Sequence, residues 1–323
     1  MFAGTRRRCS RTRSVSRGRV LGSLDIVSSS RPDSLPGTLP ATRELATSGV
    51  IASIDVDPFQ NGAYILDVDG TPQSHVFLER PDELFFEYIR RMGHVIDEVG
   101  EPGEPITAIH LGAGALTLPR YIEATRPGSR QQVIEIDRDL VDFVREVLPW
   151  SKRASIRLRY GDAREVVGSL PAGLRGSADV IVVDIFAGAR TPAHVTTVEF
   201  FTEVAELLAP HGVMVVNVAD GTGLAFARSE AATLQQVFAH VAVLAEVQVL
   251  KGRRFGNLVM VASNASSIFD NLPWLMARGP HPAGNVTGPE LRSFVGDARV
   301  ATDATAVDSP TPNKTIFQLA KRG

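Results

Sequence analysis

Hydrophobic and polar residues alternate with period two between residues 46 and 80. Apolar side chains from Val50 to Val56 fall on one face, and Asn61-Gly62 and Asp69-Gly70 separate such runs. Alternation interrupted by Asn-Gly and Asp-Gly pairs predicts a small antiparallel β meander. Over residues 82–98 the apolar positions recur with helical spacing, which predicts a helix with Asp82 as its N-cap.

From residue 106 onward, short apolar runs alternate with helical patterns. The predicted strands are Ile106–Leu111, Gln132–Ile136, Ser155–Tyr160, Ala178–Asp184, Val213–Val218, Ala242–Leu250 and Asn257–Ala262. The predicted helices are 117–126, 138–148, 163–169, 196–209 and 224–239. This alternation predicts a doubly wound parallel sheet. Only Lys251–Phe255 separate the last two strands, which is too short for a parallel crossover and predicts an antiparallel hairpin.

These patterns predict an α/β fold, a class I S-adenosylmethionine (SAM) methyltransferase-like Rossmann sheet with a small N-terminal antiparallel β domain. The predicted organisation has four parts. They are a disordered basic tail over 1–45, a small β meander plus helix over 46–100, a SAM-type Rossmann domain over 101–263 and a loop-rich C-terminal segment over 264–323.

Composition narrows the class of protein. The chain has 323 residues, 44% hydrophobic and 22% charged, as in ordinary globular domains. No apolar run approaches the ~18–20 residues of a membrane helix. A single cysteine, Cys9, excludes an intramolecular disulfide framework and fits a cytoplasmic location. The seven histidines lack the spacing of metal ligands, so we predict no metal site.

Charge is distributed unevenly along the chain. Residues 1–45 carry nine arginines and three acids, so this segment is +6 and the remainder is −8. A basic segment with few apolar residues is expected to be a solvated tail, or an over-extended start of the reading frame. A nucleic-acid arm or a transit-like segment is the alternative. The acidic remainder argues against nucleic acid as the main partner.

A glycine-containing loop, Gly112-Ala113-Gly114, follows the strand that ends at Leu111. Ligands of such sheets bind beyond the carboxyl ends of the strands, where glycines let the backbone turn sharply. Thr117 stands in place of the third glycine of a dinucleotide fingerprint, which favours a nucleoside without pyrophosphate over NAD. An ordinary tight turn is the alternative interpretation.

Carboxylates follow the next three strands. Glu135 lies 23 positions beyond Gly112, where a carboxylate accepts hydrogen bonds from a ribose diol, whereas Asp137 better fits an N-cap. Asp162 has two interpretations, an acceptor for the exocyclic amine of a purine or an N-cap. Asp184 follows four apolar residues, and a carboxylate there can hold or deprotonate an attacking amine.

From about residue 50 to 263 the chain resembles the spermidine synthase family of polyamine aminopropyltransferases. The motifs are Leu66–Gln73, Asp82-Glu83, Glu87, the glycine loop, Glu135–Asp137, Gly161–Ala163 and Asp179–Asp184. The resemblance implies a nucleoside site and a homodimer, with Asp184 beside the attacking amine. The residues implied or predicted to line the nucleoside site are Gln73, Gly112, Gly114, Glu135, Asp162 and Ala163.

Several positions differ from the family's pattern. Ala115 and Ala187 replace acids, and Phe85-Phe86 replace a polar pair, so we expect a more apolar amine half of the pocket. A buried ammonium that loses its carboxylate partner costs about 3–5 kcal/mol, which disfavours a polycationic substrate. Asn217 is the candidate for the glutamine that the family carries after the fifth strand.

Three functions are compatible with these residues. The first is aminopropyl transfer from decarboxylated SAM to a small-molecule amine, with release of methylthioadenosine and without a metal. The second is a SAM-dependent methyltransferase acting on a less cationic acceptor, motivated by the apolar residues Phe85, Phe86, Ile185 and Phe186. The third is a non-catalytic homologue that retains the nucleoside site.

Overall fold

The computed structural model describes residues 39–311. Most of the predicted tail over 1–45 lies outside the described residues, as does the end of the chain from 312. Four antiparallel strands form the first sheet, in the order β1 (Ala41–Glu44), β2 (Ile51–Val56), β3 (Ala63–Val68) and β4 (Thr71–Phe77). The sheet begins at Ala41 rather than at residue 46. Residues 41–44 form a strand that pairs antiparallel with β2, with Glu44 opposite Ile51.

The second sheet has the strand order β12-β10-β11-β9-β8-β5-β6-β7. Five of these strands run parallel to one another: β5 (Thr107–Leu111), β6 (Arg130–Glu135), β7 (Ser155–Tyr160), β8 (Ala178–Val183) and β9 (Leu208–Asp220). The chain runs outward from β5 to β7 and then returns to β8. The strand order therefore reverses between β5 and β8, the place where ligands bind in open α/β sheets.

The remaining three strands are antiparallel. They are β10 (His240–Glu246), β11 (Gly256–Ser263) and β12 (Ala283–Thr287). The predicted hairpin is therefore present as β10 and β11. Its first strand ends at Glu246 instead of Leu250, because the Glu246 side chain accepts from the Gln248 N–H and starts the short helix α7 (Val247–Leu250).

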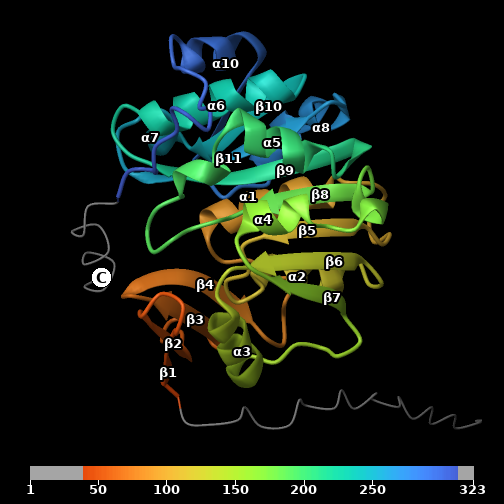
Figure 1. The fold of residues 1–323 in the computed structure, drawn as a ribbon, viewed down its shortest axis with the longest axis vertical. Coiled ribbons are helices and arrows are strands. Elements are labelled where there is room, and N and C mark those ends of the chain that lie inside the picture. The colour runs from red at the N-terminus through yellow and green to blue at the C-terminus, as the bar shows by residue number, and fades with distance from the viewer. Residues whose placement is uncertain (1–38, 312–323) are drawn as a thin grey trace, which may run out of the picture. The chain divides into compact units, whose positions relative to one another are not determined.

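Helices cover both faces of the large sheet (Figure 1). One face carries α4 (Ala163–Gly168), α5 (Val198–Ala205), α6 (Ala225–Val237) and α10 (Gly288–Val295). The other carries α1 (Glu87–Asp97), α2 (Thr117–Thr125), α8 (Ser267–Asp270) and α9 (Leu272–Ala277). The small sheet packs with α3 (Arg138–Val147) around Ile54 and Leu66, which are fully buried.

Two predictions about these elements are wrong. Helix α1 begins at Glu87 after Phe86 and not after Asp82, because the preceding Phe85 stacks on the His75 ring, with ring centroids 4.1 Å apart. The C-terminal segment is not only loops, since it contains β12 and α8 to α10. Strand β12 has little apolar character of its own and pairs with the free edge of β10, a tertiary contact that local pattern does not reveal.

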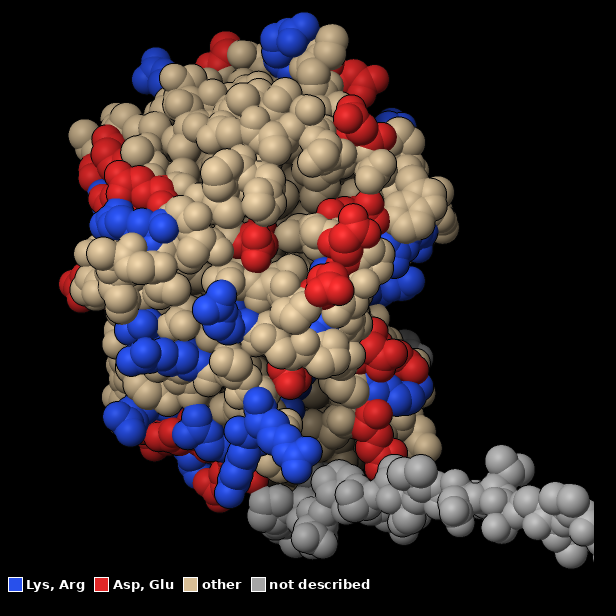
Figure 2. Space-filling view, turned by 90° about the vertical axis from the view of Figure 1, so that its right-hand side faces the viewer, with Lys and Arg blue, Asp and Glu red and all other residues tan. Residues whose placement is uncertain are grey.

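The outer surface carries both signs of charge. Figure 2 shows Lys and Arg side chains gathered in the lower half of one face, at the height of β6, β7 and α3, with acidic side chains among them. No helix within residues 39–311 combines the length and the apolar composition needed to span a bilayer. The prediction that nucleic acid is not a partner remains a prediction.

Candidate functional site

The glycine loop lies at the point where the strand order reverses. Gly112 has φ +98°, and a Cβ there would lie 2.1 Å from the Asp184 carbonyl oxygen. Gly114 has φ +48°, and a Cβ there would lie 2.5 Å from Oγ of Ser74. The Ser74 hydroxyl oxygen accepts from the Ala115 N–H at 3.0 Å. Both glycines are therefore required by close packing of the loop against β8 and β4.

A cavity of about 560 Å³ opens beside this loop. All seven residues predicted for the site line it: Gln73, Gly112, Gly114, Glu135, Asp162, Ala163 and Asp184. They come from the small sheet, from the last residue of β6 and from the segments that follow β5, β7 and β8. The topology thus brings together residues that are up to 111 positions apart in sequence, between 73 and 184.

The Glu135 side chain is anchored by backbone donors at the end of β6. Its Oε2 accepts from the Ala113 N–H at 2.9 Å, and its Oε1 accepts from the Asp137 N–H at 3.0 Å. Burial raises the pKa of Glu135, an effect that these N–H groups oppose. A carboxylate has about four lone-pair positions, so each oxygen can still accept from one hydroxyl of a diol. Asp137 caps α3 through the N–H groups of Asp139 and Leu140, as predicted.

Asp162 is the N-cap of α4. Its Oδ1 accepts from the Arg164 N–H at 2.9 Å and the Glu165 N–H at 3.3 Å. The capping interpretation is therefore confirmed, and contact with a purine amine remains a prediction. Ala163 begins the helix against the cavity, and Gln73 donates from Nε2 to the Gly188 carbonyl oxygen at 3.2 Å.

Asp184 stands immediately after β8, and its partly buried side chain lines the cavity. Asn217 donates from Nδ2 to Oδ1 of Asp184 at 2.8 Å, and Asn257 donates to the Asn217 Oδ1 at 2.9 Å. This relay fixes which end of the Asn217 amide faces the carboxylate. Burial raises the pKa of Asp184 to about 6, and the hydrogen bond from Asn217 opposes that rise. A carboxylate with such a pKa can accept a proton near neutral pH.

Several polar residues of the cavity were not predicted from the sequence, among them Tyr88 and His194. Tyr88 on α1 falls within the helical pattern predicted over residues 82–98, and its partly buried side chain lines the cavity. Burial and then the charge of Asp184 raise the pKa of Tyr88, so the phenol is neutral and close to that carboxylate. His194 lies in the short helix η2 (Ala193–Val195), and its Nε2 is 2.7 Å from Oδ2 of Asp162. No sequence motif marked His194.

The expected origin of the apolar wall is partly wrong. Ala187 lines the cavity, but Phe85, Phe86 and Ala115 do not. Phe85 packs on His75, and the fully buried Ala115 belongs to the cluster beneath the small sheet. Ile185 and Phe186 line the cavity as expected, and Ile89 and Leu118 add apolar surface that was not predicted. Within residues 39–311, no three His, Cys, Asp or Glu side chains are grouped to hold a metal ion.

The fold and cavity define an α/β protein with a class I SAM methyltransferase-like Rossmann sheet. A probable spermidine synthase from Corynebacterium glutamicum ATCC 13032 has a similar crystal structure, with a TM-score of 0.74 and 32% identity over 83% of this chain and 97% of that one. The chain belongs to the spermidine synthase family.

Curated sequences give shorter matches. A polyamine aminopropyltransferase from Vibrio vulnificus is 30% identical over 136 residues, which are 42% of this chain and 44% of that protein. A probable polyamine aminopropyl transferase from Bifidobacterium longum is 33% identical over 120 residues, 36% of this chain and 26% of that protein. The chain thus spans less than half the length of these two relatives. No protein-family model matches the chain.

Proposed function

We propose that this protein transfers the aminopropyl group of decarboxylated SAM to the amine of a small acceptor and releases methylthioadenosine. The observation that carries the proposal is the position of Asp184, a partly buried carboxylate in the same cavity as the glycine loop and Glu135. Membership of the spermidine synthase family supports the same reaction. The homodimer, the cytoplasmic location and the absence of a metal requirement remain predictions.

In the proposed reaction, the acceptor nitrogen attacks the methylene carbon of the aminopropyl group that is bonded to the sulfonium sulfur. The N–C bond forms as the C–S bond breaks, and sulfur keeps the bonding electron pair as methylthioadenosine leaves. Asp184 accepts the proton that the nitrogen loses, which is general base catalysis. Asn217 holds Oδ1 of Asp184 by its hydrogen bond, and this leaves Oδ2 to face the amine.

The cavity wall around Asp184 supports this role. Ile89, Leu118 and Phe186 line the cavity with Asp184, and within residues 39–311 no cation forms a salt bridge with that carboxylate. Its negative charge is therefore not neutralised by its own chain. An amine acceptor can use that charge in an environment of low dielectric, where the interaction is stronger than in water.

A donor comparison tests the proposed function directly. The purified chain is incubated with decarboxylated SAM or SAM, each with and without a set of mono- and diamines, and the nucleoside products are identified by mass spectrometry. Methylthioadenosine that forms only with decarboxylated SAM and an amine is the expected result. Formation of S-adenosylhomocysteine from SAM would show methyl transfer instead. Turnover of neither donor would contradict an enzymatic function.

Glu135→Gln is expected to weaken methylthioadenosine binding by about 10- to 100-fold. An amide offers a single acceptor oxygen, whereas Glu135 accepts from two backbone N–H groups on different oxygens. The glutamine NH₂ would face one of those donors, and loss of a hydrogen bond to a charged group costs about 1.5–3 kcal/mol. Titration calorimetry measures the change. Glu101→Gln, at an exposed position outside the cavity lining, is the control, and equal affinities for the two variants would contradict the ribose assignment.

A further inference from the structure

The loop over residues 185–197, which follows β8 and contributes to the cavity wall, is tied to a segment far along the chain. We define the strap as residues 301–309. Thr191 and Ser309 exchange two hydrogen bonds, with the Thr191 N–H donating to Oγ of Ser309 at 2.8 Å and the Ser309 N–H donating to the Thr191 carbonyl at 3.0 Å. The Ala193 N–H donates to Oδ1 of Asp308 at 3.0 Å. Both Thr191 and Ser309 are buried, so the strap holds this loop at its base.

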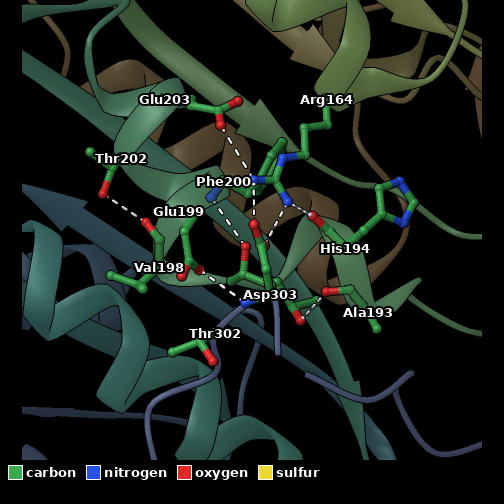
Figure 3. A network of polar contacts seen from close by, with 12 residues as sticks. Arg164, Ala193, His194, Val198, Glu199, Phe200, Thr202, Glu203, Thr302 and Asp303 are labelled. Atoms are coloured by element: carbon green, nitrogen blue, oxygen red, sulfur yellow. Dashed lines mark hydrogen bonds and ion pairs between the residues drawn. The ribbon is translucent and has the colours of Figure 1, made fainter. Parts of the chain in front are cut away.

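Arg164 makes the second connection between the strap and the loop. Its guanidinium donates to both oxygens of Asp303, at 2.6 and 2.9 Å, and to the His194 carbonyl oxygen at 3.3 Å. Glu203 accepts from the same guanidinium at 3.3 Å. Figure 3 shows Arg164 between these partners, with the His194 ring directed away from the guanidinium. A bidentate Arg–carboxylate pair is geometrically specific, so it fixes the backbone at His194.

The fixed backbone places the His194 ring against Asp162. Nε2 of His194 is 2.7 Å from Oδ2 of Asp162, and both residues line the cavity. The side chain of Asp162 is 26% exposed and that of His194 is 47% exposed, so both remain open to a ligand. Burial raises the pKa of Asp162, but the hydrogen bonds from His194 and the backbone outweigh it and the pKa lies below its ordinary value. Asp162 is therefore an acceptor at neutral pH.

The Asp162 carboxylate has one lone-pair position left for a ligand. The N–H groups of Arg164 and Glu165 occupy Oδ1, and His194 takes one position on Oδ2. Of about four lone-pair positions on a carboxylate, one on Oδ2 remains, and its direction is set by the other three contacts. This single acceptor suits one N–H of an amino group. It repels a carbonyl oxygen at the same place.

We propose that His194 is a specificity-determining positioning residue, which the strap holds against Asp162 so that this carboxylate selects a 6-aminopurine over a 6-oxopurine nucleoside. The inference rests on the proposed function, because it requires a purine nucleoside in the cavity. Asp303 acts through Arg164 at a distance from the ligand. The selected chemical feature is the exocyclic amino group of the donor substrate and of its product.

The test compares 5′-methylthioadenosine with 5′-methylthioinosine by titration calorimetry on the full chain. The wild type is expected to bind methylthioadenosine at least about tenfold more tightly, since a wrong partner at a hydrogen-bonding site leaves polar groups unpaired. His194→Ala should reduce this ratio by at least about fivefold, mainly through weaker methylthioadenosine binding. His194→Gln keeps an N–H donor of similar reach and should restore most of the ratio, which a loss of packing alone would not do.

His211→Ala is the matched control for the ring. His211 pairs with Asp179 at 3.3 Å, at the end of the sheet opposite the cavity, so this variant should keep the wild-type ratio. Asp303→Ala tests the strap and should lower the ratio without touching the nucleoside. Asp297→Ala is its control, because this exposed aspartate lies between α10 and the strap.

The outcomes separate this inference from the proposed function. Wild-type protein that binds neither nucleoside would overturn both. Wild-type protein that binds both equally, or a His194→Ala variant with an unchanged ratio, would overturn the inference and leave the proposed function standing. An unchanged ratio in Asp303→Ala would overturn the part assigned to the strap. Melting curves of every variant establish that the comparison is made between folded proteins.

Discussion

Asp184→Asn is expected to lower kcat for aminopropyl transfer by about 10²- to 10⁴-fold, the usual contribution of a general base. The asparagine amide can still accept the hydrogen bond from Asn217, so the loop geometry should survive. It cannot accept a proton from the attacking amine. Methylthioadenosine release, followed at saturating donor and acceptor, measures the loss.

The pH dependence of kcat/KM is a second test of the role of Asp184 as a base. Burial raises the pKa of Asp184 to about 6, so the carboxylate is protonated below that pH and cannot act as a base. We therefore expect kcat/KM to fall about tenfold per pH unit below pH 6 and to level off above it. The residual activity of Asp184→Asn should lack this limb.

The Asp184→Asn substitution is expected to lower activity without lowering the stability of the fold. Because the folded-state pKa lies above the ordinary value of 3.8, the charged carboxylate destabilises the fold by about 3 kcal/mol above pH 6. This cost disappears as the pH falls below 3.8, where the group is protonated in both states. At pH 8 the melting temperature of Asp184→Asn should therefore equal or exceed that of the wild type.

A matched substitution on the same strand completes the test of Asp184. Asp179 lies at the other end of β8, where its Oδ2 accepts from the Thr107 N–H at 2.8 Å. Asp179→Asn should leave kcat unchanged, since this side chain does not line the cavity. If Asp184→Asn turned over at the wild-type rate, proton acceptance by Asp184 would be excluded.

Where local pattern and tertiary structure agree, the sequence was sufficient to predict the elements. Strand β7 occupies the predicted range Ser155–Tyr160, and Asp137 caps α3 as its position before an apolar helical pattern indicated. The strand order explains why the candidate site could be assembled from spacing. Parallel strands place their carboxyl ends at one edge, so Glu135, Asp162 and Asp184 reach the same cavity.

Features that depend on contacts distant in sequence were not predictable. Strand β12 pairs with β10 about 40 residues earlier, and its sequence carries no strand signal. His194 acquires its place through Asp303, 109 positions away, and through Arg164. Phe85 stands at a position of the family's helix motif, but stacking on His75 removes it from the cavity wall. In each case a partner elsewhere in the fold determines what the residue does.

Gly112→Ala is expected to destabilise the protein by about 3–5 kcal/mol and to abolish methylthioadenosine binding. The new Cβ would lie 2.1 Å from the Asp184 carbonyl oxygen, which is backbone and cannot rotate away. A left-handed φ of +98° adds strain for any residue with a Cβ. Relief requires the end of β8 to move from the loop, which separates Asp184 from the nucleoside side of the cavity.

Gly100→Ala is the control that separates the steric clash expected in Gly112→Ala from the effect of backbone strain. Gly100 also has a left-handed φ, +65°, but no atom lies within 4 Å of the position that a Cβ would take, so we expect a cost of about 1–2 kcal/mol. At about 2–4 °C per kcal/mol for a protein of this size, Gly112→Ala should lower the melting temperature by about 10 °C and Gly100→Ala by a few degrees. Equal shifts in the two variants, with nucleoside affinity retained in Gly112→Ala, would mean that the loop and β8 adjust independently. The contact between them would then not set the geometry of the reacting groups.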